Sequence, residues 1–247
     1  MINENGPLRA APNGDFPDVK EAQNAPEKEE NTEYWIFGYG SLIFKPPPHW
    51  DVRLPGYVTG YVRRFWQSSN DHRGVPEAPG RVVTLIEKSF WESLDDPHPS
   101  HDDCTTWGVA YRIKKEYVEE VKTYLDIREQ NGYSVHNVPF HVSQESLRAN
   151  KDAYPCSCFD GQVPTQIETV CFIGTPDNEA FVGPQDPTQL AKHIVHSKGP
   201  SGENREYLYR LYESLIELAP EAHDHHLHDL VSVAKKYETE SGIVPYA

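Results

Sequence analysis

One acidic residue, Glu129, is predicted to lie on the apolar face of a helix. In the stretch KKEYVEEVKTYLDIREQNG, residues 114–132, the positions of Val121, Leu125 and Glu129 are four apart, so they stack on one side of a helix. Burial disfavours the charged form of a carboxyl group, and the negative end of the helix dipole also raises its pKa. This setting makes Glu129 a candidate general base.

A purely structural role for Glu129 is the alternative. The carboxylate could pair with Arg128, Arg63 or a backbone amide and so stabilise the fold. Arg128 faces about 100° away on the helix and is the weaker catalytic candidate. The helical spacing leaves both roles open.

The segment WIFGYGSLIF, residues 35–44, interrupts a good strand sequence with two glycines and a serine. Glycine accepts positive φ and lets the backbone approach a ligand, and successive amides can form a concavity suited to a carboxylate. An ordinary bulge or tight turn is the alternative. The segment lacks the lysine of a P-loop and has Ile43 where a dinucleotide fingerprint requires glycine. It is not a Gly-x-Ser-x-Gly elbow either, which disfavours Ser41 as an acyl nucleophile.

Composition restricts the partners. The chain has 247 residues and a formal net charge of −15, so we expect neither nucleic acid nor a membrane as a partner. We find no apolar run of about 18 residues that could span a membrane. The first residues do not have the pattern of a secretory signal, and the four cysteines lack a disulfide-framework spacing. These features predict a cytoplasmic protein.

Two clusters could in principle hold a metal. Cys156 and Cys158 are more typical of a reduced pair in a loop. In HDHHLHD, residues 223–229, only part of the cluster shares a helix face, which favours a solvated, histidine-rich helix start. We therefore predict no metal and no cofactor.

Strands are predicted mainly in the first half of the chain and helices mainly in the second. Alternating or β-branched patterns indicate strands at 33–40, 56–67, 80–88, 107–113 and 166–175. Apolar residues at helical spacing indicate helices at 114–132, 186–197, 203–219 and 226–237. Without regular strand–helix alternation, this order favours an α+β fold.

The chain is predicted to contain one domain between two tails. Residues 1–33 form an acidic leader, predicted to be disordered because it offers little apolar surface to bury. The domain then spans residues 34–237, and 238–247 form a short tail. The loop DHRGVPEAPGR, residues 71–81, is expected to be a lid or a charged loop, with roles for Arg73 and Arg81 left open.

Several motifs occur together in a specific order. They are FGYGSLI, RRFWQSSNDHRGVPEAPGRVVTLI, YLDIREQNGY and VGPQDPTQLAKHIVHSKGPSGENREYL. From about residue 35 to 237, the chain resembles the fungal branch of the ChaC-type glutathione-specific γ-glutamylcyclotransferases. The resemblance implies a small β-barrel flanked by helices, and a reaction that converts glutathione to 5-oxoproline and cysteinylglycine without a cofactor.

The resemblance also implies roles for individual residues. Glu129, in the matched pattern Arg-Glu-x-x-Gly-Tyr, corresponds to the general base. The implied substrate-binding residues are Ile36, Phe37, Gly38, Tyr39, Gly40, Ser41, Leu42, Tyr133 and Tyr207. Two other functions remain open: a γ-glutamylcyclotransferase for other γ-glutamyl amino acids or amines, and a catalytically silent protein that binds an acidic metabolite.

Overall fold

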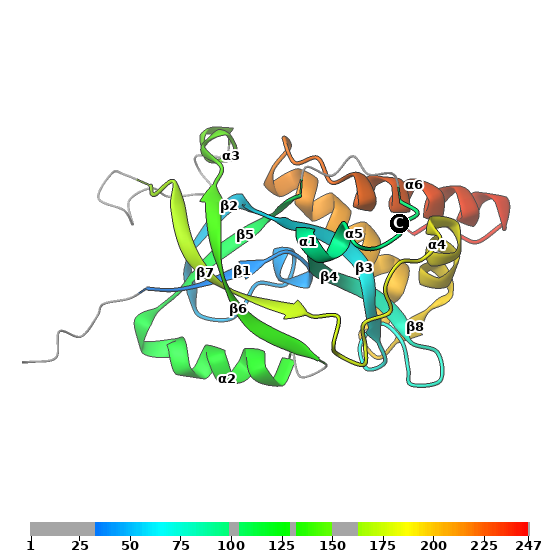
Figure 1. The fold of residues 1–247 in the computed structure, drawn as a ribbon, viewed down its shortest axis with the longest axis horizontal. Coiled ribbons are helices and arrows are strands. Elements are labelled where there is room, and N and C mark those ends of the chain that lie inside the picture. Colours follow the sequence, from blue (N-terminus) through cyan, green and yellow to red (C-terminus); the bar gives the residue numbers. More distant parts are fainter. Residues whose placement is uncertain (1–32, 99–103, 129–131, 150–162, 247) are drawn as a thin grey trace, which may run out of the picture. The chain divides into compact units, whose positions relative to one another are not determined.

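Five strands close into a barrel (Figure 1). The computed structural model describes residues 33–98, 104–128, 132–149 and 163–246. Neighbouring strands follow the order β1-β5-β2-β6-β7, and a parallel contact between β1 and β7 completes the ring. The barrel strands are β1 (Tyr34–Gly38), β2 (Trp50–Thr59), β5 (Thr105–Ile113), β6 (Tyr133–Val142) and β7 (Gln166–Gly174).

A separate antiparallel hairpin is formed by β3 (Tyr61–Ser69) and β4 (Gly80–Glu87). Sequence analysis predicted one strand across residues 56–67, and this prediction is wrong. The chain turns at Gly60, whose φ of 83° is rarely adopted by other residues, and so β2 and β3 enter different sheets. Its amide donates to the carbonyl of Cys104 at 2.8 Å, which fixes the turn.

Helices cover the hairpin and the barrel. Figure 1 shows α4, α5 and α6 grouped beside β3 and β4, and α2 contributes Val121 and Leu125 to the same buried cluster as the barrel strands. The helices are α1 (Lys88–Trp91), α2 (Val118–Arg128), α3 (Gln144–Ala149), α4 (Pro187–His196), α5 (Asn204–Leu218) and α6 (His225–Glu240). Short elements are the 3₁₀ helices η1 (Ser41–Ile43) and η2 (Lys115–Tyr117) and the strands β8 (Lys198–Gly199) and β9 (Gly202–Glu203). The predicted α+β fold, a small barrel with helices around it, is confirmed.

The start of α4 follows its local sequence signals. The carboxylate of Asp186 accepts from the amide of Gln189 at 2.9 Å, and Pro187 occupies the first turn. Leu190 and Ile194 are buried on the inner face. Capping and periodicity therefore sufficed to place this helix.

Other expectations need correction. Strand β6 was not predicted, because burial alternates only in its second half, at Val138, Phe140 and Val142. On α5, the apolar pattern at 203–219 includes Ile216, but this residue is 43% exposed because the buried face runs through Leu215 and Leu218. Helix α6 continues to Glu240, past the predicted start of the tail at residue 238. Among the described residues, no helix is both long enough and apolar enough to cross a membrane.

Candidate functional site

The loop that follows β1 forms one wall of a small cavity of about 50 Å³. Predicted site residues from three distant parts of the chain meet here: the loop itself, Tyr133 at the start of β6, and Tyr207 on α5. Ile36 and Gly38 are not among the lining residues, because they alternate along β1 with Phe37, whose side chain does line the cavity. We call this space the inner cavity; its described lining residues are Phe37, Tyr39, Gly40, Ser41, Leu42, Val83, Tyr133, Phe172 and Tyr207.

Gly40 is required for space and not for a special backbone angle. A Cβ atom here would lie 2.9 Å from Cγ2 of Val83 and 3.0 Å from the hydroxyl oxygen of Tyr207. Its φ is −124°, so the ability of glycine to adopt positive φ is not used at this position. The missing side chain leaves room where the loop, β4 and α5 converge.

Tyrosine hydroxyls hold the walls together. Tyr39 donates to the carbonyl of Phe172 on β7 at 2.7 Å, and Tyr133 donates to the carbonyl of Val83 on β4 at 3.2 Å. Tyr111 of β5 donates to the carbonyl of Leu42 at 2.9 Å. Two of these bonds fix the loop to β7 and β5, and the third joins β6 to β4.

The C-terminal end of α2 reaches this loop. Arg128, the last residue of α2, donates from Nη2 to Oγ of Ser41 at 2.5 Å. Glu129 lies outside the described residues. Val121 and Leu125, which share its predicted helix face, are both fully buried. The catalytic role of Glu129 stays a prediction.

A larger pocket of about 570 Å³ adjoins the inner cavity. Ser41, Tyr133 and Tyr207 line both spaces. We call the larger space the outer pocket; its other described lining residues are Lys45, Ser68, Ser69, Asp71, His72, Arg73, Val82, Tyr124, Ile127, Arg128 and Ser201. A ligand with a small group at one end and a longer polar remainder could occupy both.

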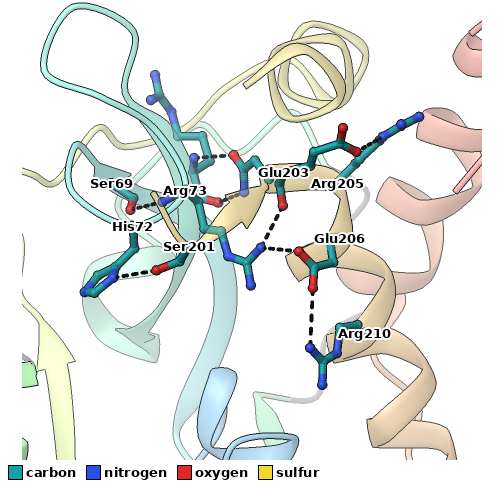
Figure 2. A network of polar contacts seen from close by, with 10 residues as sticks. Ser69, His72, Arg73, Ser201, Glu203, Arg205, Glu206 and Arg210 are labelled. Atoms are coloured by element: carbon teal, nitrogen blue, oxygen red, sulfur yellow. Dashed lines mark hydrogen bonds and ion pairs between the residues drawn. The ribbon is translucent and has the colours of Figure 1, made fainter. Parts of the chain in front are cut away.

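Arg73 anchors a polar network behind the outer pocket (Figure 2). It is 3% exposed and donates from Nη1 to Glu206 at 2.8 Å and to the carbonyl of Glu203 at 2.9 Å. Its guanidinium carbon lies 5.7 Å from the centre of the Tyr207 ring. Burial raises the pKa of Glu206, but hydrogen bonds and charge from Arg73 and Arg210 outweigh that effect and lower it overall. The network fixes the helix that carries Tyr207.

The outer pocket is cationic although the chain is acidic. Burial lowers the pKa of Lys45, and the nearby charges of Arg73, Arg210 and Arg128 lower it further, against an opposing effect of Glu206. The backbone amide of Lys45 donates to the carbonyl of Ser41 at 2.8 Å, whereas its side chain has no ion pair or hydrogen bond within the described part of the chain. The sequence analysis missed Lys45 and Glu206. The i,i+4 spacing of Glu206 and Arg210 was a usable signal for the network, whereas nothing local marked Lys45.

The histidine-rich segment divides between surface and core. His223, His225 and His228 are exposed, whereas His226 is 2% exposed and its Nε2 accepts from the amide of Phe65 at 3.2 Å. Among the described residues, no group of three or more His, Cys, Asp or Glu side chains is arranged to hold a metal. Cys156 and Cys158 lie outside the described residues.

Aromatic side chains such as Phe65 and Trp66 are expected to pack the barrel, and this holds for Phe65, which belongs to the buried cluster of the barrel strands, but not for Trp66. Both lie on β3 in the separate hairpin. Phe65 meets the ring of Tyr207 edge-on at 5.8 Å, and Trp66 belongs to a smaller buried cluster with Val62 and Trp91. Phe65 therefore supports the site from behind.

Comparison with known proteins places the chain in a family. The model of the family described as "ChaC-like protein" matches residues 34–237. The chain belongs to the ChaC-like family. A relative from Saccharomyces cerevisiae, named glutathione-specific γ-glutamylcyclotransferase, is 40% identical over 84% of this ChaC-like chain and 98% of its own length. A relative of the same name from Schizosaccharomyces pombe is 39% identical over 82% of the chain and 92% of its own length.

A solved structure agrees with this assignment. A yeast γ-glutamylcyclotransferase, described as specific to glutathione, superposes on the ChaC-like chain with a TM-score of 0.70 at 40% identity. The match covers 84% of this chain and 97% of the other. The family and the fold implied by the sequence motifs are thus confirmed.

Proposed function

We propose that this chain is a glutathione-specific γ-glutamylcyclotransferase that forms 5-oxoproline and cysteinylglycine. The observation that carries the proposal is the junction of the inner cavity with the cationic outer pocket at Ser41, Tyr133 and Tyr207. The inner cavity suits a γ-glutamyl group and the outer pocket a peptide with a terminal carboxylate. The names of the similar proteins from both yeasts support the same reaction.

The loop at Gly40 and Ser41 holds the substrate in this proposal. The first amides of η1 lack acceptors within the helix and can donate to the α-carboxylate of the γ-glutamyl group. Gly40 leaves space for the approach of that group. Ser41 Oγ already accepts a hydrogen bond from Arg128, so the loop conformation is fixed before substrate enters. Less conformational entropy is therefore lost when the substrate binds.

The reaction is an intramolecular displacement. Glu129 takes a proton from the α-ammonium group, and the freed amine attacks the γ-carbonyl carbon to close a five-membered ring. The bond from that carbon to the cysteinyl nitrogen then breaks as the proton passes from Glu129 to the departing amine, and the ring nitrogen loses its second proton, so that 5-oxoproline keeps one N–H and the amine of cysteinylglycine becomes protonated. Holding the amine about 3–3.5 Å from the carbonyl contributes several kcal/mol to lowering the barrier.

Lys45 is the proposed contact for the glycine carboxylate of glutathione. It lines the outer pocket, and among the described residues no carboxylate neutralises it directly. A γ-glutamyl amine has no such carboxylate, so this contact would favour glutathione.

The deciding experiment measures 5-oxoproline formed from glutathione, γ-glutamylalanine and γ-glutamyl-lysine by the purified chain. We expect the highest kcat/KM with glutathione. Higher values with either alternative would replace the substrate assignment. Binding of glutathione without 5-oxoproline would replace the enzyme with a metabolite-binding protein.

A further inference from the structure

A second large pocket lies between the β3–β4 loop, α4 and β8. Its volume is about 660 Å³, and its lining includes Arg81, Lys192 and Lys198. Among the described residues it shares no lining residue with the inner cavity or the outer pocket. It is therefore separate from the proposed substrate site.

This pocket is lined by positive charge. Arg81, Lys192 and Lys198 are cations, and no described lining residue is acidic. The whole chain has a formal net charge of −15. A concave cluster of one sign on a protein of the opposite sign concentrates ligands of the complementary charge.

The protein itself does not neutralise these cations. Arg81 donates from Nε to the amide oxygen of Gln185 at 3.1 Å and from Nη1 to the carbonyls of Gly80 at 2.9 Å and Pro79 at 3.3 Å. Nζ of Lys192 lies 5.5 Å from the centre of the Tyr237 ring. None of the ion pairs among the described residues involves Arg81, Lys192 or Lys198.

The position of Arg81 makes this arrangement costly without a ligand. Its guanidinium is half-buried, and burial lowers its pKa. Neutral acceptors offset only part of the desolvation of such a group. A bound anion would supply the missing charge, and the planar fork of arginine matches the oxygens of a phosphate group.

We propose that this pocket binds a small phosphorylated metabolite. Its volume exceeds that of a single phosphate ion, and its cations come from three separate elements, which suits an organic molecule that carries several phosphate oxygens. Gln185 and Leu190 provide amide and apolar contacts for the organic part.

Calorimetric titration of the full chain with ATP, inorganic phosphate and citrate tests the proposal. We expect saturable binding of ATP at one site, weaker binding of phosphate, and at least tenfold weaker ATP binding by the double variant Lys192→Gln/Lys198→Gln. The control Lys122→Gln/Lys236→Gln removes the same charge from exposed positions and should bind ATP as the wild type does. Unchanged melting temperatures would show that both variants fold.

Four results would overturn the proposal. The first is that ATP shows no saturable binding. The second is that the control variant loses as much ATP affinity as Lys192→Gln/Lys198→Gln, and the third is that citrate binds as tightly as ATP. The fourth is a loss in Lys45→Gln without one in Lys192→Gln/Lys198→Gln, which would place ATP in the outer pocket. Because binding is measured directly, these outcomes do not depend on whether the chain turns over glutathione.

Discussion

Gly40 shows how the size of one side chain controls the candidate site. Its missing Cβ is the reason that the loop, Val83 and Tyr207 can converge around an open space. We expect Gly40→Ala to lower kcat/KM for glutathione by about a hundredfold or more, because misplacement of a bound group by about 1 Å can cost that much. Steady-state kinetics and thermal melting together check this. A folded variant with wild-type kcat/KM would contradict it.

Glu129 is the residue with the largest predicted effect on the chemical step. Glu129→Gln preserves size but cannot accept the proton, so we expect kcat to fall by about 10²–10⁴-fold. Glu119→Gln is a matched control on α2, since the Glu119 side chain is 86% exposed. Production of 5-oxoproline is the measurement. Near-normal turnover by folded Glu129→Gln would remove Glu129 from the mechanism.

Lys45 gives the proposed substrate contact a pH dependence. Its pKa is lowered by burial and by neighbouring arginines, so it loses its charge at a lower pH than an ordinary lysine. We expect KM for glutathione to rise in that alkaline range, and Lys45→Gln to have a raised KM throughout, with a smaller change in kcat. A γ-glutamyl amine should show neither effect. Identical pH profiles of KM for the wild type and Lys45→Gln would exclude this contact.

At the scale of elements, Gly60 determines which sheet each strand joins. Its φ of 83° is the turning point between β2 of the barrel and β3 of the hairpin, and a Cβ here would meet no atom within 4 Å. Gly60→Ala should therefore introduce only backbone strain and reduce the free energy of unfolding by about 1–2 kcal/mol. Denaturant unfolding measures this, with the exposed neighbour Thr59→Ala as the control. Unchanged stability would mean that the turn tolerates a side chain.

At the scale of the whole molecule, His226 joins the helical layer to the hairpin. Burial lowers its pKa well below the ordinary value of 6.5, and the charges of Arg64, His98 and Arg63 act in the same direction. The folded state therefore keeps His226 neutral, while the unfolded chain takes up a proton below pH 6.5. Its contribution to stability is complete above that pH and is lost as the pH falls.

We expect the free energy of unfolding to decrease below about pH 6.5, by up to about 1.4 kcal/mol per pH unit for this one group. His226→Gln can still accept from the Phe65 amide but does not titrate, so its stability should depend less on pH. The exposed His223→Gln should retain the wild-type slope. Parallel curves for the wild type and His226→Gln, from denaturant unfolding at several pH values, would contradict this assignment.

Much of the local structure followed from sequence because its causes are local. The Asp186 cap and the Leu190 and Ile194 stripe depend on hydrogen bonds and side-chain spacing within a few residues, and the β-branched and apolar run of β4 is a continuous segment. Strand β6 escaped prediction because its first half contains no fully buried residue and lacks alternation. The motifs that indicated the family are likewise continuous segments.

Only the tertiary structure decided which residues share a space. Tyr39, Tyr133 and Tyr207 meet because barrel closure and the packing of α5 bring distant segments together, and no local pattern encodes such a meeting. The same holds for Lys45 in the outer pocket and for Arg81 in the second one. Sequence by itself determined the elements, the family motifs and the candidate residues. The convergence of charges and cavities depended on long-range packing, because it arises from contacts between elements.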